Sequence, residues 1–304
     1  MTIIEFTERF QTEESCKEYF RDVRMQQGVI CKKCHCSKHY WLKGKWQFQC
    51  SECGFRTTLR SGTVMENSRL SFRKWLLIML FMTSTKKGFS ACEIQRQIGH
   101  KRYTTVLDIM HRIRKVMGKR DDMYNLSDMI EFDEGHFETA VPAVVKAKLK
   151  RGRGSQRQTN VAVMAESTCL EDINTGKRTK QCRYFKMKVL DNFKSEAVNS
   201  VMNSLVNEDA IIFSDNSTSY FDISKYVEMH LVEKSNEQTT KETLKWVHIA
   251  ISNAKRNFLG VYHKIKRKHL QNYLNEFVYK LNRRFFSSIF ERLVVACVYW
   301  YTND

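Results

Sequence analysis

The sequence predicts a multidomain α+β protein made of three consecutive regions. Residues 1–60 are rich in cysteine, residues 61–127 have a helical pattern, and residues 128–304 begin with strands and end with long helices. Three observations predict this organisation: cysteines paired at metal-binding spacing, apolar residues at helical spacing, and apolar runs that end in acidic residues. The regions follow one another without a Pro-rich or Gly-rich linker, because the chain has one proline and only 12 glycines.

The composition indicates a polyanionic partner. Lys and Arg number 51 against 33 acidic residues, which gives a net charge of +18, and a globular protein this basic most often binds nucleic acid. The longest apolar run, from Trp75 to Met82, is too short to span a membrane, and the N-terminus lacks a signal pattern. We therefore expect a cytoplasmic protein with reduced cysteines and no membrane partner.

Four of the ten cysteines form two CxxC knuckles. Cys31 and Cys34 make the first knuckle, Cys50 and Cys53 make the second, and fifteen residues separate them. Each knuckle brings two thiolates to one ion, so together they can complete a tetrahedral Zn²⁺ site. The residues between the knuckles alternate as in a small hairpin, which predicts an N-terminal zinc ribbon. Cys36 is interpreted as an extra loop thiol, and the ribbon's role, structural support or nucleic-acid contact, stays open.

A sequence pattern typical of a helix-turn-helix follows the ribbon. A short amphipathic helix is predicted at 90–99, and a second helix opens after a turn and continues over 104–117. In DNA-binding versions of this motif the second helix enters the major groove, where the turn residues Lys101 and Arg102 would supply positive charge. Two ordinary packed helices with a solvated basic face are the alternative.

Two of the apolar runs in the third region end in residues with a carboxylate side chain. We predict strands at 129–134, 160–165, 184–190 and 210–215, with a helix at 195–205. Asp133 lies near the end of the first strand and Asp215 ends the fourth. This succession is the arrangement of an RNase H-like α/β catalytic domain. Two such carboxylates can hold two Mg²⁺ ions that activate a nucleophile and stabilise a leaving oxygen, and Mn²⁺ should replace Mg²⁺.

A later helix, predicted at 241–258, would carry the third ligand of such a site. Asn253 lies within this helix, and its amide oxygen can ligate a divalent metal. An ordinary polar helix residue is the alternative for Asn253. His248 and His263 are interpreted as packed or solvated side chains.

These pieces together resemble an insertion-sequence transposase of the DDE superfamily, in the zinc-ribbon group related to Merlin elements. The similarity spans nearly the whole chain, and the order of the pieces is what makes it specific. Besides the CxxC pair, it is carried by FDE at 132–134, KRGRGS at 150–155, SD at 214–215, WVHIAISNAKR at 246–256, LGVYH at 259–263, KHLQNYLNEF at 268–277 and LNRR at 281–284.

The resemblance implies cut-and-paste transposition, in which hydrolysis at the transposon ends precedes attack of the freed 3′-OH on target DNA. By motif, Asp133, Asp215 and Asn253 are then the catalytic metal ligands, with Asn253 where related enzymes usually have Glu. Glu134 is assigned a supporting place beside the site, and Lys255 is assigned to position a phosphate. A homodimer or higher homo-oligomer on double-stranded DNA, in the bacterial nucleoid, is also implied, because two ends must be cut and joined.

Two basic stretches suit contact with the DNA backbone near that site. Residues 143–159 and 254–273 each hold six Lys or Arg and no acidic residue. The expected contacts are Lys150, Arg151, Arg153, Arg256, Lys264, Lys266, Arg267 and Lys268. A solvated charged face is the alternative for each stretch.

Two other classes of function are left open. A transposase-derived DNA-binding protein that no longer cuts would need only the ribbon and the helical pair, and Asn253 is the best argument for it. An RNA-acting nuclease or a zinc-dependent scaffold is also compatible, because a fold does not determine a function.

Overall fold

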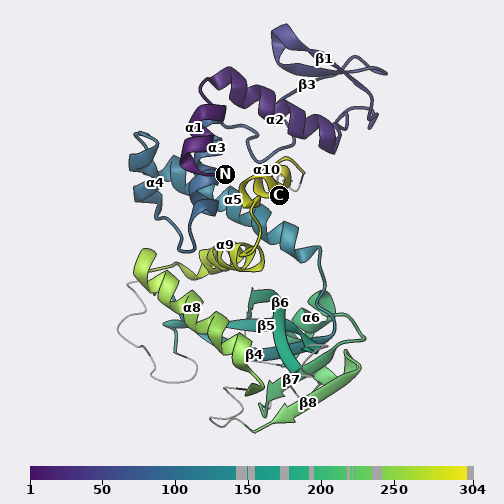
Figure 1. Ribbon diagram of the computed structural model, residues 1–304, viewed down its shortest axis with the longest axis vertical. Coiled ribbons are helices and arrows are strands. Elements are labelled where there is room, and N and C mark those ends of the chain that lie inside the picture. Colours follow the sequence, from purple (N-terminus) through teal and green to yellow (C-terminus); the bar gives the residue numbers. More distant parts are fainter. Residues whose placement is uncertain are drawn as a thin grey trace. The chain divides into compact units, whose positions relative to one another are not determined.

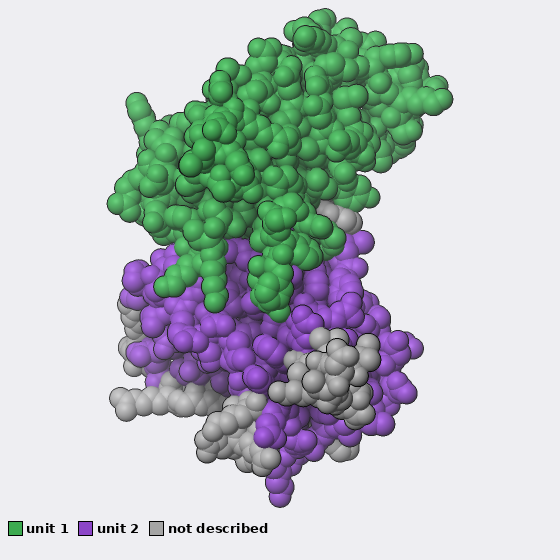
Figure 2. Space-filling view, in the orientation of Figure 1, with its two compact units in different colours: residues 1–120, 283–304 green, residues 121–282 purple. Residues whose placement is uncertain are grey.

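The computed structural model describes residues 1–141, 149, 155–171, 178–191, 195–217, 220, 222–234 and 242–299. Its contacts divide the chain into two compact units, which Figure 2 shows in different colours. Unit 1 comprises residues 1–120 and 283–304, and unit 2 comprises residues 121–282. Within the described ranges, no helix is long and apolar enough to cross a membrane.

This division differs from the three predicted regions. The predicted boundary at residue 60 falls inside unit 1. The predicted third region spans 128–304, but its residues 283–304 belong to unit 1. The physical reason is α10 (Ile289–Tyr299), whose buried apolar side chains pack against α2 (Glu13–Gln27) and α3 (Phe72–Ser84). Sequence periodicity shows that α10 is apolar, but it does not show which distant helices cover it.

Hydroxyl side chains cap most of the helices of unit 1. The caps precede α1 (Ile3–Arg9), α2, α3 and α4 (Ala91–Gln97), and each accepts a hydrogen bond from an amide of the first turn. Thr12, the cap of α2, forms a capping box with Ser15. After a turn, α4 is followed by α5 (Tyr103–Asp122), as the helix-turn-helix pattern predicts.

The ribbon is a three-stranded antiparallel sheet in the order β1-β2-β3. Its strands are β1 (His39–Leu42), β2 (Gln47–Cys50) and β3 (Arg56–Thr58). The first two form the predicted hairpin between the knuckles, with Trp41 opposite Phe48. The rings of these two residues lie 4.8 Å apart and form a small aromatic layer on the hairpin.

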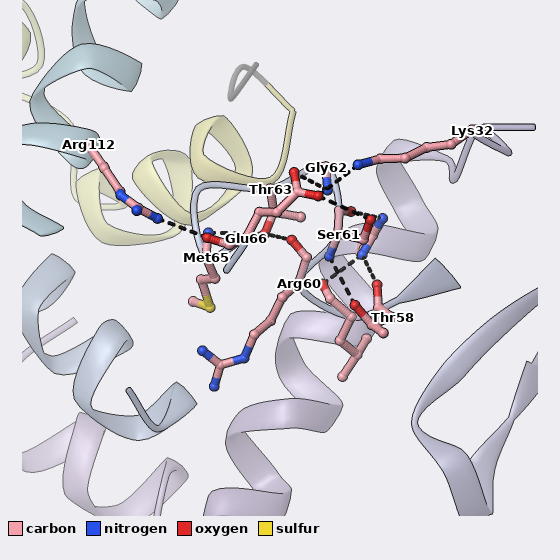
Figure 3. A network of polar contacts seen from close by, with 11 residues as sticks. Lys32, Thr58, Arg60, Ser61, Gly62, Thr63, Met65, Glu66 and Arg112 are labelled. Atoms are coloured by element: carbon pink, nitrogen blue, oxygen red, sulfur yellow. Dashed lines mark hydrogen bonds and ion pairs between the residues drawn. The ribbon is translucent and has the colours of Figure 1, made fainter. Parts of the chain in front are cut away.

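The segment that leads from the ribbon into α3 is held by polar contacts (Figure 3). The Glu66 carboxylate accepts hydrogen bonds from Lys32 Nζ at 2.8 Å and from the Gly62 amide at 3.1 Å. From α5, the Arg112 guanidinium donates to the Glu66 carbonyl oxygen at 2.9 Å. Lys32 thus pairs with an acid of its own unit, and the ribbon loses one of the lysines that it could offer to a phosphate.

Unit 2 is built on a five-stranded sheet in the order β6-β5-β4-β7-β8 (Figure 1). The strands are β4 (Met129–Glu138), β5 (Gln158–Glu171), β6 (Arg178–Val189), β7 (Ile211–Asp215) and β8 (Met229–Glu233). The first three are antiparallel neighbours, whereas β7 runs parallel to β4 after α6 (Ser195–Leu205). The predicted succession of three strands, a helix and a strand is confirmed, and β8 is an addition that was not predicted.

Helices cover the sheet of unit 2 on both faces. One apolar cluster joins the sheet to α8 (Lys245–Val261) and α9 (Leu270–Asn282), with Phe137 and Val163 packed beside Val247 and Leu274. The other cluster joins the sheet to α6 and contains the β4 residues 130 and 132. Because side chains alternate along a strand, odd-numbered β4 residues face α8 and even-numbered ones face α6. Figure 1 shows α8 lying across the strands.

Candidate active site

The four predicted zinc ligands come together in unit 1. The Sγ atoms of Cys31, Cys34, Cys50 and Cys53 all lie within 4.8 Å of one another. Cys31 Sγ is 3.6 Å from Cys53 Sγ, and Cys34 Sγ is 3.4 Å from Cys50 Sγ. Thiolates bound to one zinc ion at about 2.3 Å are separated by about 3.8 Å in a tetrahedron, so the cysteine positions fit a structural zinc ion.

The two knuckles share one backbone conformation. Gly54 follows the second knuckle with φ +67°, and His35 follows the first with φ +58°. The amides of both residues return to the first cysteine of their knuckle, at 3.0 Å for His35 and 3.1 Å for Gly54. His35 therefore contributes to the turn of the knuckle through its backbone, and its side chain is not part of the four-cysteine group.

Asp133 and Asp215 lie at neighbouring positions on adjacent parallel strands of unit 2. The register of β4 and β7 pairs Phe132 with Ser214, so the next residue on each strand is an aspartate. Both aspartates share the face of the sheet that α8 covers, because Phe213 packs into the α8 cluster while Ile212 packs into the α6 cluster. The structure corrects one detail: β4 continues to Glu138, so Asp133 lies within the strand, where its pairing with β7 ends.

Burial shapes the ionisation of this pair. Burial raises the pKa of Asp133, and the nearby Asp215 carboxylate raises the pKa further. The Glu134 amide, which donates to Asp133 Oδ1 at 2.7 Å, and the His248 ring act in the opposite direction on the pKa. A bound cation would favour the charged form of Asp133 against both of these effects, which is a common property of metal-binding acid pairs.

A buried glutamate that the sequence did not single out holds the start of α8. Glu131 is fully buried on β4. Its Oε2 accepts hydrogen bonds from the amides of Trp246 at 2.7 Å and Val247 at 3.1 Å. The residue before α8 is Leu244, whose side chain makes no capping hydrogen bond. The Glu131 carboxylate therefore satisfies the first-turn amides and complements the positive end of the helix dipole. The contact fixes α8 on the strand that carries Asp133.

This cap predicts a stability effect. Replacing Glu131 by Ala leaves two buried amides without their acceptor, which we expect to lower the free energy of unfolding of unit 2 by roughly 2 kcal/mol and its Tm by about 4–8 °C. Replacement by Gln keeps one acceptor oxygen and should cost less. Thermal unfolding followed by circular dichroism measures both. The exposed Glu208 provides the control, and a Glu131→Ala variant as stable as Glu208→Ala would refute the cap.

The contact between α8 and β4 is close along its length. A Cβ atom on Gly135 would lie 2.8 Å from Phe137 Cε2 and 3.4 Å from Ile251 Cγ1. Glycine at this position therefore makes room for the Phe137 ring of the same strand, while Ile251 of α8 would be in ordinary van der Waals contact. Two residues before Gly135, the Asp133 Oδ2 atom lies 3.8 Å from Nδ1 of His248, on the first turns of α8.

Asn253 lies on a different side of α8 from His248. The two residues are five positions apart, which places them about 140° apart around the helix axis. The Asn253 side-chain oxygen accepts a hydrogen bond from Arg256 Nη2 at 3.0 Å. His248 therefore lies beside Asp133, whereas the Asn253 side chain contacts Arg256 on another side of the helix.

Lys255 lies on the same side of α8 as His248, since seven residues are almost two helical turns. Its Nζ is 5.9 Å from the centre of the Phe137 ring. It also lines a pocket of 280 Å³ together with His263 and Ile265. Lys255 is thus an exposed lysine beside this pocket.

Glu134 points away from the aspartate pair. It is the next residue after Asp133 on β4, so its side chain lies on the α6 face of the sheet. There Glu134 Oε2 accepts from Asn160 Nδ2 at 3.0 Å, and Asn160 Oδ1 lies 2.7 Å from His136 Nδ1. Glu134 thus belongs to a polar group on the other face, and any influence on Asp133 passes through its backbone amide.

The basic residues that the sequence assigned to DNA are placed in part. On unit 2, the exposed side chains are those of Arg256, Lys264, Lys266, Arg267 and Lys268. Lys101 and Arg102 are exposed in the turn between α4 and α5 on unit 1. Lys150, Arg151 and Arg153 lie outside the described residues.

Two family models match the chain in the segments that contain these sites. The ISXO2-like transposase domain matches residues 125–282, and the transposase zinc-ribbon domain matches residues 11–56. A comparison with curated proteins found no match.

Among solved structures, the chain is similar to one described as "Drosophila P element transposase strand transfer complex", with 12% identity and a TM-score of 0.26. The match covers 79% of this chain but only 63% of that protein. A TM-score this low carries no argument, so the assignment depends on the two family models. Because the first model alone covers more than half of the chain, the chain belongs to the insertion-sequence DDE transposases that combine a zinc ribbon with an ISXO2-like transposase domain.

Proposed function

We propose that this transposase cuts DNA at the ends of its element and joins the freed 3′-OH to target DNA. The observation that carries the proposal is the placement of Asp133 and Asp215 at neighbouring positions of two parallel strands, on the face covered by α8. Asp133 and Asp215 would hold the divalent cations, Mg²⁺ or Mn²⁺. Such ions, when bound, activate the attacking oxygen and stabilise the leaving oxygen of an in-line displacement.

The chain's own residues supply binding and orientation in this proposal. Glu131 fixes the start of α8 against β4, and the cationic side chains of that helix would face the DNA that reaches the acid pair. Lys255 and the exposed residues of 264–268 contact the DNA backbone, which places the scissile phosphate beside the aspartates. The zinc ribbon and the α4–α5 pair supply further DNA contacts, with Lys101 and Arg102 in the turn.

The partners form part of the proposal. Double-stranded DNA is both the substrate and the target, and a homodimer or higher oligomer is needed to hold two element ends together. Such a complex would act in the bacterial cytoplasm, at the nucleoid. Lys150, Arg151 and Arg153 are proposed as DNA contacts from the sequence alone.

A DNA-binding protein that does not cut is the second candidate. The observation that favours it is the composition of α8, which contains no acidic residue between Lys245 and Val261. Asn253, which the resemblance proposes as the third ligand, is uncharged and pairs with Arg256. This candidate requires DNA binding through the basic surfaces but no reaction at the aspartates.

One experiment separates the two candidates. The purified chain is incubated with end-labelled DNA that carries the terminal sequence of its own element, in Mg²⁺, in Mn²⁺ or in EDTA. Nicking at the element end that requires the metal supports the transposase. Binding in a gel-shift assay without nicking in either metal would reject cutting and support the second candidate.

A further inference from the structure

We propose that a basic groove on unit 1 binds the phosphate backbone of DNA, with Arg69 and Lys74 as its principal contacts. The groove follows residues 67–74, the segment that leads from the ribbon into α3. This inference rests on the proposed function, because it names a surface of unit 1 that would hold the DNA. It adds that surface to the ribbon and to the α4–α5 pair.

The groove consists of two hollows that adjoin. The first has a volume of 790 Å³ and is lined by Lys17 of α2 and by the first turn of α3. The second has a volume of 580 Å³ and is lined by α5 as far as Arg112. Arg69, Ser71 and Lys74 line both hollows, so the two form one continuous surface. All of the lining residues belong to unit 1.

Positive charge dominates the lining of the groove. Five Lys or Arg line the first hollow and four line the second, with Arg69 and Lys74 counted in both. The acidic lining residues are Glu13 and Asp108. The Glu13 carboxylate accepts hydrogen bonds from the first two amides of α3, at 2.7 and 3.1 Å, and so occupies the positive end of that helix. An anionic ligand would therefore meet the cationic side chains rather than the helix end.

Arg69 and Lys74 keep their charges available for a ligand. Arg69 is exposed, and Lys74 is half-buried. Lys74 Nζ donates to the neutral carbonyl oxygen of Gly99 at 3.4 Å. In the part of the chain that the structure describes, neither residue forms an ion pair with an acid. Each of them can therefore neutralise one phosphate and release the counterion that is condensed there.

The backbone that carries Arg69 is held on both sides of this residue. The Arg60 guanidinium donates to the carbonyl oxygens of Ser68 and Leu70, both at 2.6 Å. The fully buried Trp75 donates from Nε1 to Ser68 Oγ at 2.9 Å. Binding through a segment that is already ordered loses less conformational entropy. The groove therefore presents the Arg69 side chain from a backbone that DNA does not have to order.

The groove continues onto the surface that the helix-turn-helix pattern assigns to DNA. Arg102, immediately before α5, lines the second hollow together with Thr105 and Arg112. Asp108 and Ile109 line it as well, so the lining positions recur every three or four residues and form one side of α5. A recognition helix in the major groove has phosphates along its sides. The groove thus lies where the DNA backbone beside α5 would pass.

The chemistry of the lining favours phosphates over base edges. Arginine, lysine, serine and threonine side chains make the usual contacts to phosphate oxygens, and such contacts carry no sequence information. We therefore expect the groove to strengthen binding to every duplex by the same factor. The sequence of the element end would be read by other residues.

The test measures duplex binding by the full chain in EDTA, so that no cleavage takes place. Fluorescence anisotropy gives the affinity for element-end DNA and for an unrelated duplex of equal length, each at several salt concentrations. We expect Arg69→Gln and Lys74→Ala each to weaken both affinities by about tenfold. Each variant should also reduce the slope of log K against log salt by about 0.9, the value for one phosphate contact.

Two further variants serve as controls. Lys86 is exposed beyond the C-terminal end of α3 and does not line the groove, so Lys86→Ala removes the same charge from unit 1 at another place. It should keep the wild-type affinity and salt slope. Arg69→Lys keeps the charge and should keep most of the binding. The Tm and the zinc content of every variant check that unit 1 remains folded.

Three outcomes would overturn the inference. The first is unchanged affinity and salt slope when Arg69→Gln and Lys74→Ala are combined. The second is a loss restricted to element-end DNA, because that would show base recognition. The third is an equal loss in Lys86→Ala, because that would show a general effect of charge.

The proposed function is judged separately, by nicking in Mg²⁺ or Mn²⁺. A wild-type chain that binds both duplexes through the groove and does not nick would keep this inference and reject cutting. A chain that nicks, and whose groove variants bind as the wild type does, would reject the groove alone. A wild-type chain that binds neither duplex would reject both.

Discussion

Replacing Asp133 by Asn is expected to abolish DNA cleavage while leaving DNA binding intact. The substitution keeps the shape of the side chain but removes the negative charge that would hold the divalent cation. Asp133 also neighbours both Asp215 and His248, so its charge acts on both of these side chains. We expect cleavage of labelled element-end DNA to fall by about 10³-fold or more, since the cation supplies several kcal/mol of transition-state stabilisation.

The matched control is the neighbouring acid. Glu134→Gln changes the same charge one residue later, but its side chain is on the opposite face of the sheet, bonded to Asn160. We expect this variant to retain most of its cleavage activity. If Glu134→Gln and Asp133→Asn lost cleavage activity equally, negative charge near this strand would matter for cleavage whichever face of the sheet carries it. Gel-shift affinities of both variants check that DNA binding is unchanged.

Removal of the zinc ligands is expected to unfold the ribbon. The short sheet of the ribbon has a small apolar core, and structural zinc contributes about 10–16 kcal/mol to such modules. Cys50→Ser removes one of four thiolates from a group within 4.8 Å. We expect the wild-type chain to hold one zinc per chain and the variant to lose it. The ribbon should then become sensitive to protease while unit 2 keeps its unfolding transition.

Cys36→Ser is the control for the zinc prediction. Its Sγ lies 3.8 Å from Ser51 Oγ and is not part of the four-cysteine group. The variant should keep its zinc and its protease resistance. The zinc content of each variant is measured after denaturation with a chromophoric chelator. A Cys36→Ser variant that loses zinc, or a Cys50→Ser variant that keeps it, would contradict the assignment.

The sequence predicted the zinc ligands and the aspartate pair because both signals are local. A CxxC knuckle defines its geometry within four residues, and an apolar run that ends in aspartate indicates both the strand and its functional end. Position along the chain was therefore enough to identify Cys31, Cys34, Cys50, Cys53, Asp133 and Asp215 as candidates. The structure shows that each group is brought together by neighbouring elements.

The position of His248 beside Asp133 could not be predicted in the same way. It depends on which side of α8 faces the sheet, and that side is decided by contacts with β4 more than a hundred positions earlier in the chain. Glu131 holds the start of α8 in this contact, yet in the sequence it is one acid in an apolar strand. The helical separation of five residues then places His248 and Asn253 on different sides of α8.

The place of α10 in unit 1 could not be predicted for a similar reason. The helical pattern predicts α10, but its burial against α2 and α3 joins opposite ends of the chain. Periodicity reports that a helix has an apolar face and does not report the partner of that face. The strand β8 was missed because it is short and largely exposed, so its pattern is weak.

The central claim is that one divalent-metal site lies between β4, β7 and α8, and iron-directed cleavage of the chain tests it most directly. Fe²⁺ replaces Mg²⁺ or Mn²⁺ in such sites, and with ascorbate and peroxide it cuts the backbone close to the ion. We predict cuts near residues 133, 215 and 248 that excess Mn²⁺ suppresses and Asp133→Asn removes. Cuts confined to other segments of unit 2, or cuts near these residues that persist in Asp133→Asn, would contradict the account.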